Sequence, residues 1–497
     1  MLARDCQRLT VRCFGWMVLT ILGAGTVLAQ PELPPPSTDE TKKSASNAIP
    51  NQIDPGVTTA PVVSPCPIYT LPDCIQIALN TQPSLNAARA SLASSQSSMN
   101  TLMGQRHIAS LFAPDIDIRK QQSIKGVAVA EAELFAVQVE VIYNVTRNYW
   151  TIVYARSQAD VAASTVKMLK EFVTKAQEAV KIGASRRVNA STVNTLLVYQ
   201  SKVQEKQVEA EIGVRRAFSA LREAMGVDQN CNFDIADRKL PRVVMSVSRD
   251  QVIAFATSRR AEIIQAALAS NIWDLEVQAQ GAVRFRPANR TFAMGADIHV
   301  KSLPQGSRDA NYRPEALGLE MPTAVVGSKE QRMEKTLALS ARTHAVYAKT
   351  VGLISLEAEN SYLSIEEALL KLVPVEVGYR AALQLRKDAE KAQVDEARRI
   401  DDVQDIVLSQ VLAAQSISGY NDALFQLILA ITSLERVTAG GIVANFADVP
   451  LPELPSNDKG NVDPKDLKDP KDEKKDDSGL PKLMTLPRNL PPVMIPR

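Results

Sequence analysis

Residues 73–88 read DCIQIALNTQPSLNAA, and residues 250–267 read DQVIAFATSRRAEIIQAA. Each stretch is a short amphipathic start that leads into long helical tracts. Each tract closes on a Leu-rich helix followed by glycine, as SALREAMG at 219–226 and as TSLERVTAGG at 432–441. Because glycine just past the last helical residue is a signal for a helix end, the chain is interpreted as two copies of one plan.

Long helices dominate both copies. Aromatic residues make up only 5% of the 497 residues, which is typical of long helices and coiled coils rather than of a broad globular core. The two longest helices would span about 84 and 108 Å at 1.5 Å per residue, so they need lateral partners along their whole length. The predicted fold is therefore mainly α, with long antiparallel coiled-coil helices in two structural repeats. The helices are predicted over 72–110, 127–182 and 187–225 in the first copy, and over 248–285, 327–398 and 400–439 in the second.

Pro374 lies inside the longest predicted helix. Proline lacks a backbone N–H donor, so it is expected to kink or break the helix at this point. The interruption is interpreted either as a local bend or as a functional hinge.

The ends of the chain differ in composition from its centre. Three arginines precede an apolar run that ends in Val-Leu-Ala before Gln30, which indicates a secretory signal peptide. The segments flanking the helical tracts are rich in proline and polar residues, which is typical of disorder. The predicted parts are a signal peptide at 1–29, a disordered linker at 30–70, helical repeats at 71–243 and 244–445, and a disordered Pro-, Lys- and Asp-rich tail at 446–497.

After the signal peptide, no run of about 20 apolar residues occurs, so no transmembrane helix is expected. An exported chain of this kind is secreted, periplasmic, or inserted in an outer membrane as strands. Three cysteines remain after cleavage, Cys66, Cys74 and Cys231. An odd number cannot all pair within one chain, so the alternatives are one disulfide, for example between Cys74 and Cys231, or free thiols.

The second copy contains an interruption with strand character near 287–327. TFAMGADIHV at 291–300 alternates partly between apolar and polar residues, and ALGLEMPTAVV follows at 316–326. This pattern predicts a β-hairpin with one apolar side, which either caps the helices or faces lipid. In the first copy only IASLFAPDIDI at 108–118 resembles a strand.

Residues 398–406 read RRIDDVQDI. Asp402 and Asp405 are three residues apart, so on a helix they share one face. The pair is either an ordinary solvated stripe or part of a functional site that needs acid.

No pattern in the sequence indicates an enzyme. The three histidines, His107, His299 and His344, are not at metal-ligand spacing. Nucleophile-elbow, Walker and dinucleotide-binding motifs do not occur. The net charge of +2 does not indicate a particular partner, such as nucleic acid. We expect no catalytic activity, no metal and no cofactor.

Taken in order along the chain, these features resemble the TolC-like outer-membrane efflux proteins. IALNTQPSL and SRRAEI resemble the starts of the two repeats in that family. EMPTAVVGSKEQRMEKTLAL resembles the family's passage from strand to helix, Gly183 resembles its turn glycine between two long helices, and DVQD at 402–405 resembles the acidic start of its last helix. The resemblance covers about residues 71–441.

The resemblance implies a homotrimer in the outer membrane with a large periplasmic portion. Each protomer would contribute short β-hairpin segments to one shared β-barrel in outer-membrane lipid, and helices to one periplasmic tunnel. Such a duct is passive, and an inner-membrane pump with a periplasmic adaptor protein delivers the substrate. The alternative is an exported periplasmic coiled-coil protein, structural or adaptor-like, without a true barrel.

The resemblance also implies a tunnel constriction formed by Asp402 and Asp405. Three copies of each carboxylate would meet near the axis, where crowded like charges attract cations. Arg398 and Arg399 would form links that hold this gate closed. Two features depart from the family: the first copy has no clear hairpin, and the turn glycine expected before DVQD is missing.

Overall fold

The computed structural model describes residues 67–105, 113–183, 188–243, 245, 247–284, 286–292, 320–392, 403–443 and 446. These residues are mainly helical, as predicted. In chain order the elements are β1 (Ile68–Tyr69), α1 (Leu71–Thr81), α2 (Pro83–Met103), α4 (Ile116–Ile182), α5 (Ala190–Met225), β2 (Asp234–Ile235), α6 (Arg249–Arg259), α7 (Ala261–Ala282), β3 (Ala288–Arg290), β4 (Ala324–Val326), α8 (Lys329–Ala392) and α9 (Val403–Val437).

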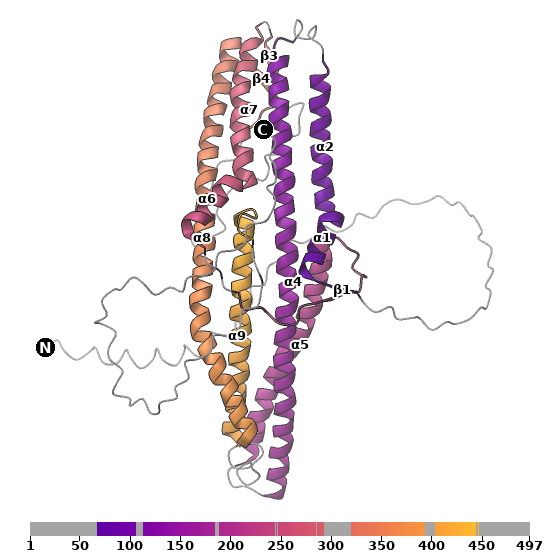
Figure 1. Cartoon of the computed structure of the whole chain (residues 1–497), viewed down its shortest axis with the longest axis vertical. Coiled ribbons are helices and arrows are strands. Elements are labelled where there is room, and N and C mark those ends of the chain that lie inside the picture. Colours follow the sequence, from indigo (N-terminus) through magenta and orange to yellow (C-terminus); the bar gives the residue numbers. More distant parts are fainter. Residues whose placement is uncertain are drawn as a thin grey trace, which may run out of the picture. The chain divides into compact units, whose positions relative to one another are not determined.

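The described helices of the body stand side by side in four columns (Figure 1). α4 and α8 each form a column alone. The other two columns are stacked, with α2 above α5 and α7 above α9, and with the short helices α1 and α6 kinked at the level of the joints. Packing contacts join α8 to α7 and α9, α4 to the same two helices, and α4 to α2 and α5. The row therefore ends in α8 on one side and in the α2–α5 column on the other.

Each predicted opening helix is broken by one extended residue. Gln82 separates α1 from α2 with φ −63° and ψ 121°, and Arg260 separates α6 from α7 with φ −62° and ψ 127°. At Gln82 the following Pro83 disfavours helical backbone in the residue before it. At Arg260 no proline follows, and the same backbone conformation is accompanied by buried ion pairs that are described below. Single helices over 72–110 and 248–285 were therefore wrong predictions.

Glycine ends α5 where it meets this joint. Gly226 has φ 67°, and a Cβ placed on it would lie 2.7 Å from Cα of Gln82. The joint residues also bond to the end of α5, since Thr81 Oγ1 donates to Met225 O at 2.6 Å and Gln82 Nε2 donates to Ala224 O at 3.1 Å. α9 closes similarly, because Gly440 has φ 67° and its neighbour Gly441 contacts a side chain of α6. Both closing glycines thus lie where the sequence predicts helix ends.

α4 begins at Ile116, eleven residues before the predicted start. The strand interpretation of 108–118 is wrong for Ile116–Ile118, which form the first turn of α4, while residues 108–112 lie outside the described residues. Arg119 N donates to Asp115 O at 3.0 Å, and its guanidinium pairs with the Asp115 carboxylate at 3.1 Å. These contacts start the helix at the residue after Pro114–Asp115.

α8 continues through Pro374 without a break. Pro374 is exposed, so its ring meets solvent rather than a neighbouring column. A break at this residue is therefore excluded, and packing against α9 on the opposite side supports the helix. The expected bend or hinge stays a prediction. A proline inside a helix nevertheless removes one N–H donor.

Two short strand pairs flank the helices. β1 pairs with β2 in parallel, with Asp234 N donating to Pro67 O and Ala236 N to Tyr69 O, both at 2.9 Å. Residues 68–69 were predicted to be part of the disordered linker, and they are instead ordered by this pairing. β3 and β4 pair antiparallel, as expected of the two ends of a hairpin, whose residues 293–319 lie outside the described residues.

Cys74 and Cys231 are not bonded to each other. Cys74 is completely buried in the core between the columns, and Cys231 lies partly buried after α5. The disulfide considered between them is therefore absent, although both side chains belong to the same hydrophobic cluster. Burial raises the pKa of the Cys74 thiol to about 12, which keeps it protonated at neutral pH. Cys66 lies outside the described residues.

Candidate functional site

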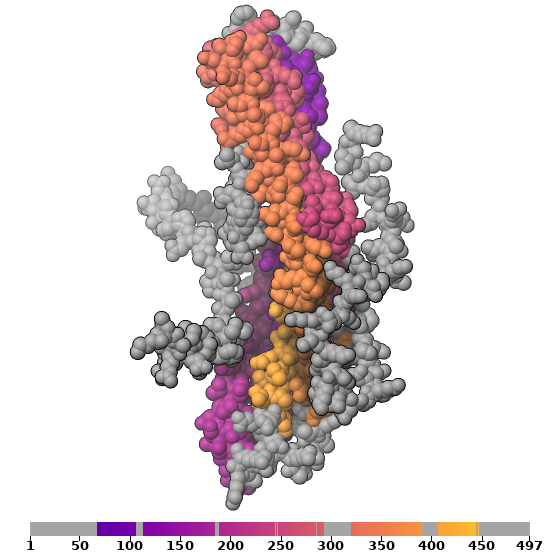
Figure 2. Space-filling model, turned by 90° about the vertical axis from the view of Figure 1, so that its left-hand side faces the viewer, coloured from indigo at the N-terminus to yellow at the C-terminus, as the bar shows by residue number. Residues whose placement is uncertain are grey.

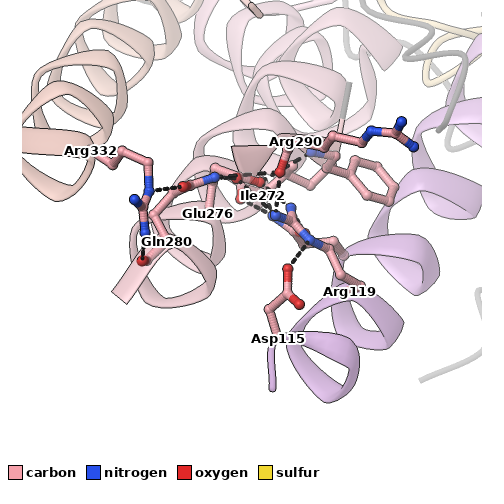
Figure 3. Close-up of polar contacts among 9 residues, drawn as sticks. Asp115, Arg119, Ile272, Glu276, Gln280, Arg290 and Arg332 are labelled. Carbon is pink, nitrogen blue, oxygen red and sulfur yellow. Dashed lines mark hydrogen bonds and ion pairs between the residues drawn. The ribbon is translucent and has the colours of Figure 1, made fainter. Parts of the chain in front are cut away.

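A buried polar cluster lies where the β3–β4 pair meets the helices (Figure 3). It joins α4, α7 and α8 to the two ends of the predicted hairpin. We call it the root network, and it comprises Asp115, Arg119, Gln122, Glu276, Gln280 and Arg332.

Arg332 fastens α8 to the end of α7 and to both strand ends. Its side chain is completely buried. The guanidinium donates to Gln280 Oε1 at 3.0 Å and to Gly327 O at 2.9 Å, and further to the carbonyl oxygens of Gln280, Val283 and Arg286. Gln280 and Val283 belong to the C-terminal turn of α7, whose free carbonyls and negative dipole end favour a cation. One side chain thus donates hydrogen bonds to backbone carbonyl oxygens that lie before β3, after β4 and at the end of α7.

Glu276 is the anionic centre of the same network. Its side chain is 2% exposed and accepts from Arg119, from Gln122 Nε2 at 3.0 Å and from Gln280 Nε2 at 2.8 Å. The backbone N–H of Phe292, just past β3, also donates to it at 3.2 Å. A buried carboxylate needs such donors, because an unpaired one would be costly to bury. The network therefore fixes the place where the chain leaves the helices.

A second ionic cluster lies at the joint between α6 and α7. Arg260, within the SRRAEI sequence, donates to Glu262 at 2.7 and 2.9 Å and pairs with Glu357 of α8 at 3.2 Å. Glu357 pairs in turn with Arg436 of α9 at 3.1 Å. Burial favours the neutral form of Glu262, but the bonds and charge of Arg260 outweigh it and hold the pKa of that carboxyl below its usual range. Arg260 thus connects the joint between α6 and α7 directly to α8, and through Glu357 to α9.

At the other end of the body, Gly183 ends α4. It has φ 65°, and its backbone N–H donates to the carbonyl of Val180 at 3.4 Å. α5 begins seven residues later and packs back along α4, with buried contacts among Leu169, Phe172 and Leu196. Ile182, beside the glycine, is 78% exposed. Gly183 therefore lies between two antiparallel helices, and its role as the turn glycine of the family stays a prediction.

The proposed constriction lies mostly outside the described residues. Arg398, Arg399 and Asp402 are not among them. Asp405 belongs to the first turn of α9 by its backbone, and its side chain is not described. The grouping of these four residues therefore stays a prediction.

Arg332 and Glu276 were not singled out from the sequence. A signal existed for Arg332, because a cation in the first turns of a helix opposes the helix dipole and needs a special partner. Glu276 stands in the sequence NIWDLEVQAQ of α7, in which half of the residues are apolar, and a buried carboxylate there demands a cation. Sequence alone could not identify that cation as Arg119, which is 157 residues away.

The described residues contain no group of three or more potential metal ligands. His344 contacts Asp274 at 3.1 Å, and His107 and His299 lie outside the described residues. Among the same residues, every helix is too short or too polar to cross a membrane.

The arrangement of columns is that of known outer-membrane channels. The chain is similar to the outer-membrane channel OprN, with a TM-score of 0.58 and 16% identity over 74% of this chain and 90% of that one. It is also similar to the CmeC outer membrane channel of Campylobacter jejuni (TM-score 0.57, 12% identity, 75% and 86% covered) and to VceC of Vibrio cholerae (0.55, 13%, 74% and 96%). No protein-family model and no curated protein sequence matches the chain.

The fold is therefore that of a channel-forming outer-membrane protein. More particularly, it is the TolC-like fold of outer-membrane efflux channels, and the match spans nearly the whole length of those structures.

Proposed function

We propose that this protein is the outer-membrane channel of a tripartite efflux or secretion system. It passes substrates passively through a periplasmic helical tunnel and has no enzymatic activity. The fold supports this proposal, and so does the sequence pattern of an exported chain. The observation that carries it is a pair of unused packing surfaces at the two ends of the helix row.

α8 carries two heptad seams on opposite faces. The first seam is buried or partly buried, packs toward α9, and comprises Ala358, Ser361, Ile365, Ala368, Leu372, Val375, Tyr379 and Ala382. The second seam, which we call the outer seam of α8, has the same 3–4 spacing, and its apolar members Leu363, Leu370, Val373 and Val377 are 48–67% exposed. A heptad repeat of apolar residues is the pattern of a helix that packs against another helix. Figure 2 shows α8, in orange, on the surface of the body along much of its length.

α5, at the opposite end of the row, has the same double pattern. Its inner seam packs along α4 and comprises Val193, Leu196, Gln200, Val203, Gln207, Ala210, Val214, Ala217, Leu221 and Ala224. Its outer seam is exposed and comprises Val198, Ser201, Glu205, Val208, Ile212 and Arg215. Three of these six are apolar, so the α5 outer seam is also suited to a helix–helix contact.

We expect the outer seam of α8 in one copy to pack against the outer seam of α5 in the next copy. A surface at one end of a row that meets a different surface at the other end is a heterologous contact, and such contacts close into rings when the rotation permits. A ring of helix rows encloses a tunnel. The number of copies, three, follows from the family resemblance, and so do the shared β-barrel in outer-membrane lipid, the periplasmic adaptor and the inner-membrane pump.

The acidic pair completes the proposal at the periplasmic end. Asp402 and Asp405 precede or begin α9, and the turn at Gly183 lies at the same end of the body. Rings of carboxylates from three copies would narrow the tunnel and select cations. Arg398 and Arg399, about one helical turn earlier, would link this ring to its surroundings.

Fractionation of cells that express the full chain tests the proposal. An outer-membrane channel remains with the outer-membrane fraction and migrates as a trimer that dissociates on heating. Full release on osmotic shock would instead support the exported coiled-coil protein without a barrel. Purified trimer should also conduct ions across a planar lipid bilayer.

A further inference from the structure

A row of three arginines leads from the end of α7 into β3. Residues 277–296 contain Arg284, Arg286 and Arg290 and no acidic residue. All three arginine side chains are exposed. Within the described part of the chain, no carboxylate pairs with their guanidinium groups. Three positive charges thus stand together at the surface without a compensating acid on the same segment.

The three arginines share one side of the segment. Val283 has extended backbone, with φ −93° and ψ 111°, and β3 begins five residues later. Successive side chains of an extended chain point to opposite faces. The arginines occupy even positions, and the odd positions Val283 and Asn289 are only 4% and 7% exposed. Figure 3 shows the Arg290 side chain pointing away from the root network. The arginines therefore belong to one outward face.

The root network fixes the backbone beneath this face. Arg332 donates to the carbonyl oxygen of Arg286. The carbonyl oxygen of Arg290 accepts from Arg119 at 2.8 Å and from Gln280 at 3.4 Å. At a rise of about 3.3 Å per residue, Arg284 lies about 7 Å from Arg286, and Arg286 about 13 Å from Arg290. Their guanidinium groups are thus presented from fixed positions and can reach separate anionic groups.

The neighbouring strand adds apolar groups to the same face. In the β3–β4 pair, Ala288 lies opposite Val326, and Arg290 lies opposite Ala324. Directly opposite residues of an antiparallel pair share a face, and Val326 is 71% exposed. We call this surface the arginine face, and it comprises Arg284, Arg286, Ala288, Arg290, Ala324 and Val326. Cations beside exposed apolar groups suit the boundary between lipid and water better than a water-filled tunnel, where the valine would gain nothing.

We propose that the arginine face binds the phosphate headgroups of anionic phospholipids in the outer-membrane leaflet that faces the periplasm. In Figure 1, β3 and β4 lie at the opposite end of the body from the α4–α5 turn. They are the two ends of the predicted hairpin, so the face lies where the chain leaves the helices toward the membrane. A guanidinium group donates two parallel hydrogen bonds to a phosphate. The inference rests on the proposed channel function and adds a lipid-binding site to it.

Lipid titration of the purified full-length protein in detergent tests the site. The probes are fluorescent phosphatidylglycerol, which is anionic, and phosphatidylcholine with the same acyl chains. Wild-type protein should bind phosphatidylglycerol more tightly. The triple variant Arg284→Gln, Arg286→Gln, Arg290→Gln should bind it more weakly by on the order of a hundredfold, at roughly fivefold for each arginine near an anionic surface. Its affinity for phosphatidylcholine should not change.

Two further variants separate the site from bulk charge. The matched control Arg147→Gln, Arg216→Gln, Arg259→Gln removes the same charge from exposed positions on α4, α5 and α6, and should bind both lipids like the wild type. Lysine at all three positions of the arginine face keeps the charge but loses the paired hydrogen bonds, so it should restore only part of the affinity. Circular dichroism checks that each variant is folded.

Three results would overturn the lipid site while leaving the channel function intact. The first is equal affinity of the wild type for the two lipids, which needs no variant. The second is full displacement of phosphatidylglycerol by millimolar inorganic phosphate, which would indicate a site for free anions. The third is a glutamine variant that keeps its lipid affinity but changes the ratio of cation to anion permeability in planar bilayers, which would place the face in the tunnel.

Fractionation distinguishes failure of the lipid site from failure of the channel function. If wild-type protein is released by osmotic shock, the proposed function fails and the lipid site fails with it. If wild-type protein remains with the outer membrane and the titration shows no preference for phosphatidylglycerol, the lipid site alone is wrong.

Discussion

The Arg332 guanidinium donates to Gln280 through both its side-chain oxygen, at 3.0 Å, and its carbonyl oxygen, at 3.4 Å. Gln280 in turn donates to Glu276 at 2.8 Å. A buried cation and a buried anion are therefore joined by one neutral amide instead of by direct contact. This arrangement ties the start of α8, the end of α7 and the start of α4 into one unit at the hairpin ends.

Arg332→Met should lower the free energy of unfolding by about 3 kcal/mol or more, because the substitution leaves several buried carbonyl oxygens without donors. Chemical denaturation followed by circular dichroism measures the change. Arg342→Met is the matched control, since Arg342 pairs with Glu320 at the surface, where both side chains are more than a third exposed. Exposed pairs contribute about 0–1 kcal/mol. Equal losses in the two variants would contradict the structural role of Arg332.

Gly226→Ala should also destabilise the protein, by about 1–3 kcal/mol. The left-handed backbone at Gly226 strains any other residue, and the added methyl group meets the Gln82 backbone at 2.7 Å. Gly213→Ala, in the middle of the same helix with nothing within 4 Å, should instead stabilise by up to about 1 kcal/mol. Thermal unfolding of both variants tests the contrast, which fails if their melting temperatures shift in the same direction.

Stability should fall as the pH rises above about 9. Burial raises the pKa of Cys74 to about 12 from an ordinary value of 9.0, and burial together with Asp422 raises that of Tyr154 to about 12 from 10.0. Between these values the unfolded chain has lost the protons and the folded chain has kept them, so unfolding releases protons and is favoured by alkali. Cys74→Ala should make the decline between pH 9 and 12 shallower. An unchanged slope would mean that Cys74 titrates normally in the folded protein.

Charge in the outer seam of α8 should weaken assembly without unfolding the protomer. Val377→Lys places an ammonium group where a neighbouring copy is expected to pack, while Val377 is 61% exposed in the single chain. Analytical ultracentrifugation should show a larger fraction of monomer, with helicity by circular dichroism unchanged. Ser364→Lys, exposed on the same helix but outside both seams, is the control. Val208→Lys in the α5 outer seam should reproduce the effect, and intact trimers in both seam variants would reject the proposed contact.

Asp402→Ala combined with Asp405→Ala should change the ion conductance of the channel or its block by multivalent cations. Removing carboxylates from a narrow pore removes the attraction for cations. Planar bilayer recordings at low salt show the effect most clearly, since salt screens exposed charges. Conductance and block that match the wild type would reject the acidic constriction.

Much of the fold could be predicted because helix signals are local. The ends of α5 and α9 were predicted from Gly226 and Gly440, and the long helices from their apolar repeats. The breaks at Gln82 and Arg260 were missed, although Pro83 gave a signal for the first. At Arg260 the extended backbone accompanies ion pairs with Glu262 and with Glu357, a residue nearly a hundred positions away, and no local pattern records such a contact.

The same limit applies to the sites. Charge patterns near Asp402 and Asp405 are visible in the sequence, whereas Arg119 and Glu276, which form a buried pair, look like ordinary helix charges. The structural role of such a charged side chain depends on its burial and on its partners from other columns. The resemblance to a family supplied the order of the elements, and only the packing of the columns revealed which charges are enclosed.

The alternation of columns has a mechanical consequence. α4 and α8 are continuous, while the α2–α5 and α7–α9 columns consist of two helices that meet end to end, so each jointed column lies beside a continuous one. A movement at the Gly183 end therefore reaches the root network along unbroken helix only through α4 and α8. In the other two columns the helix is interrupted, so the same movement has to pass through the bonds at the joints near Gln82 and Arg260.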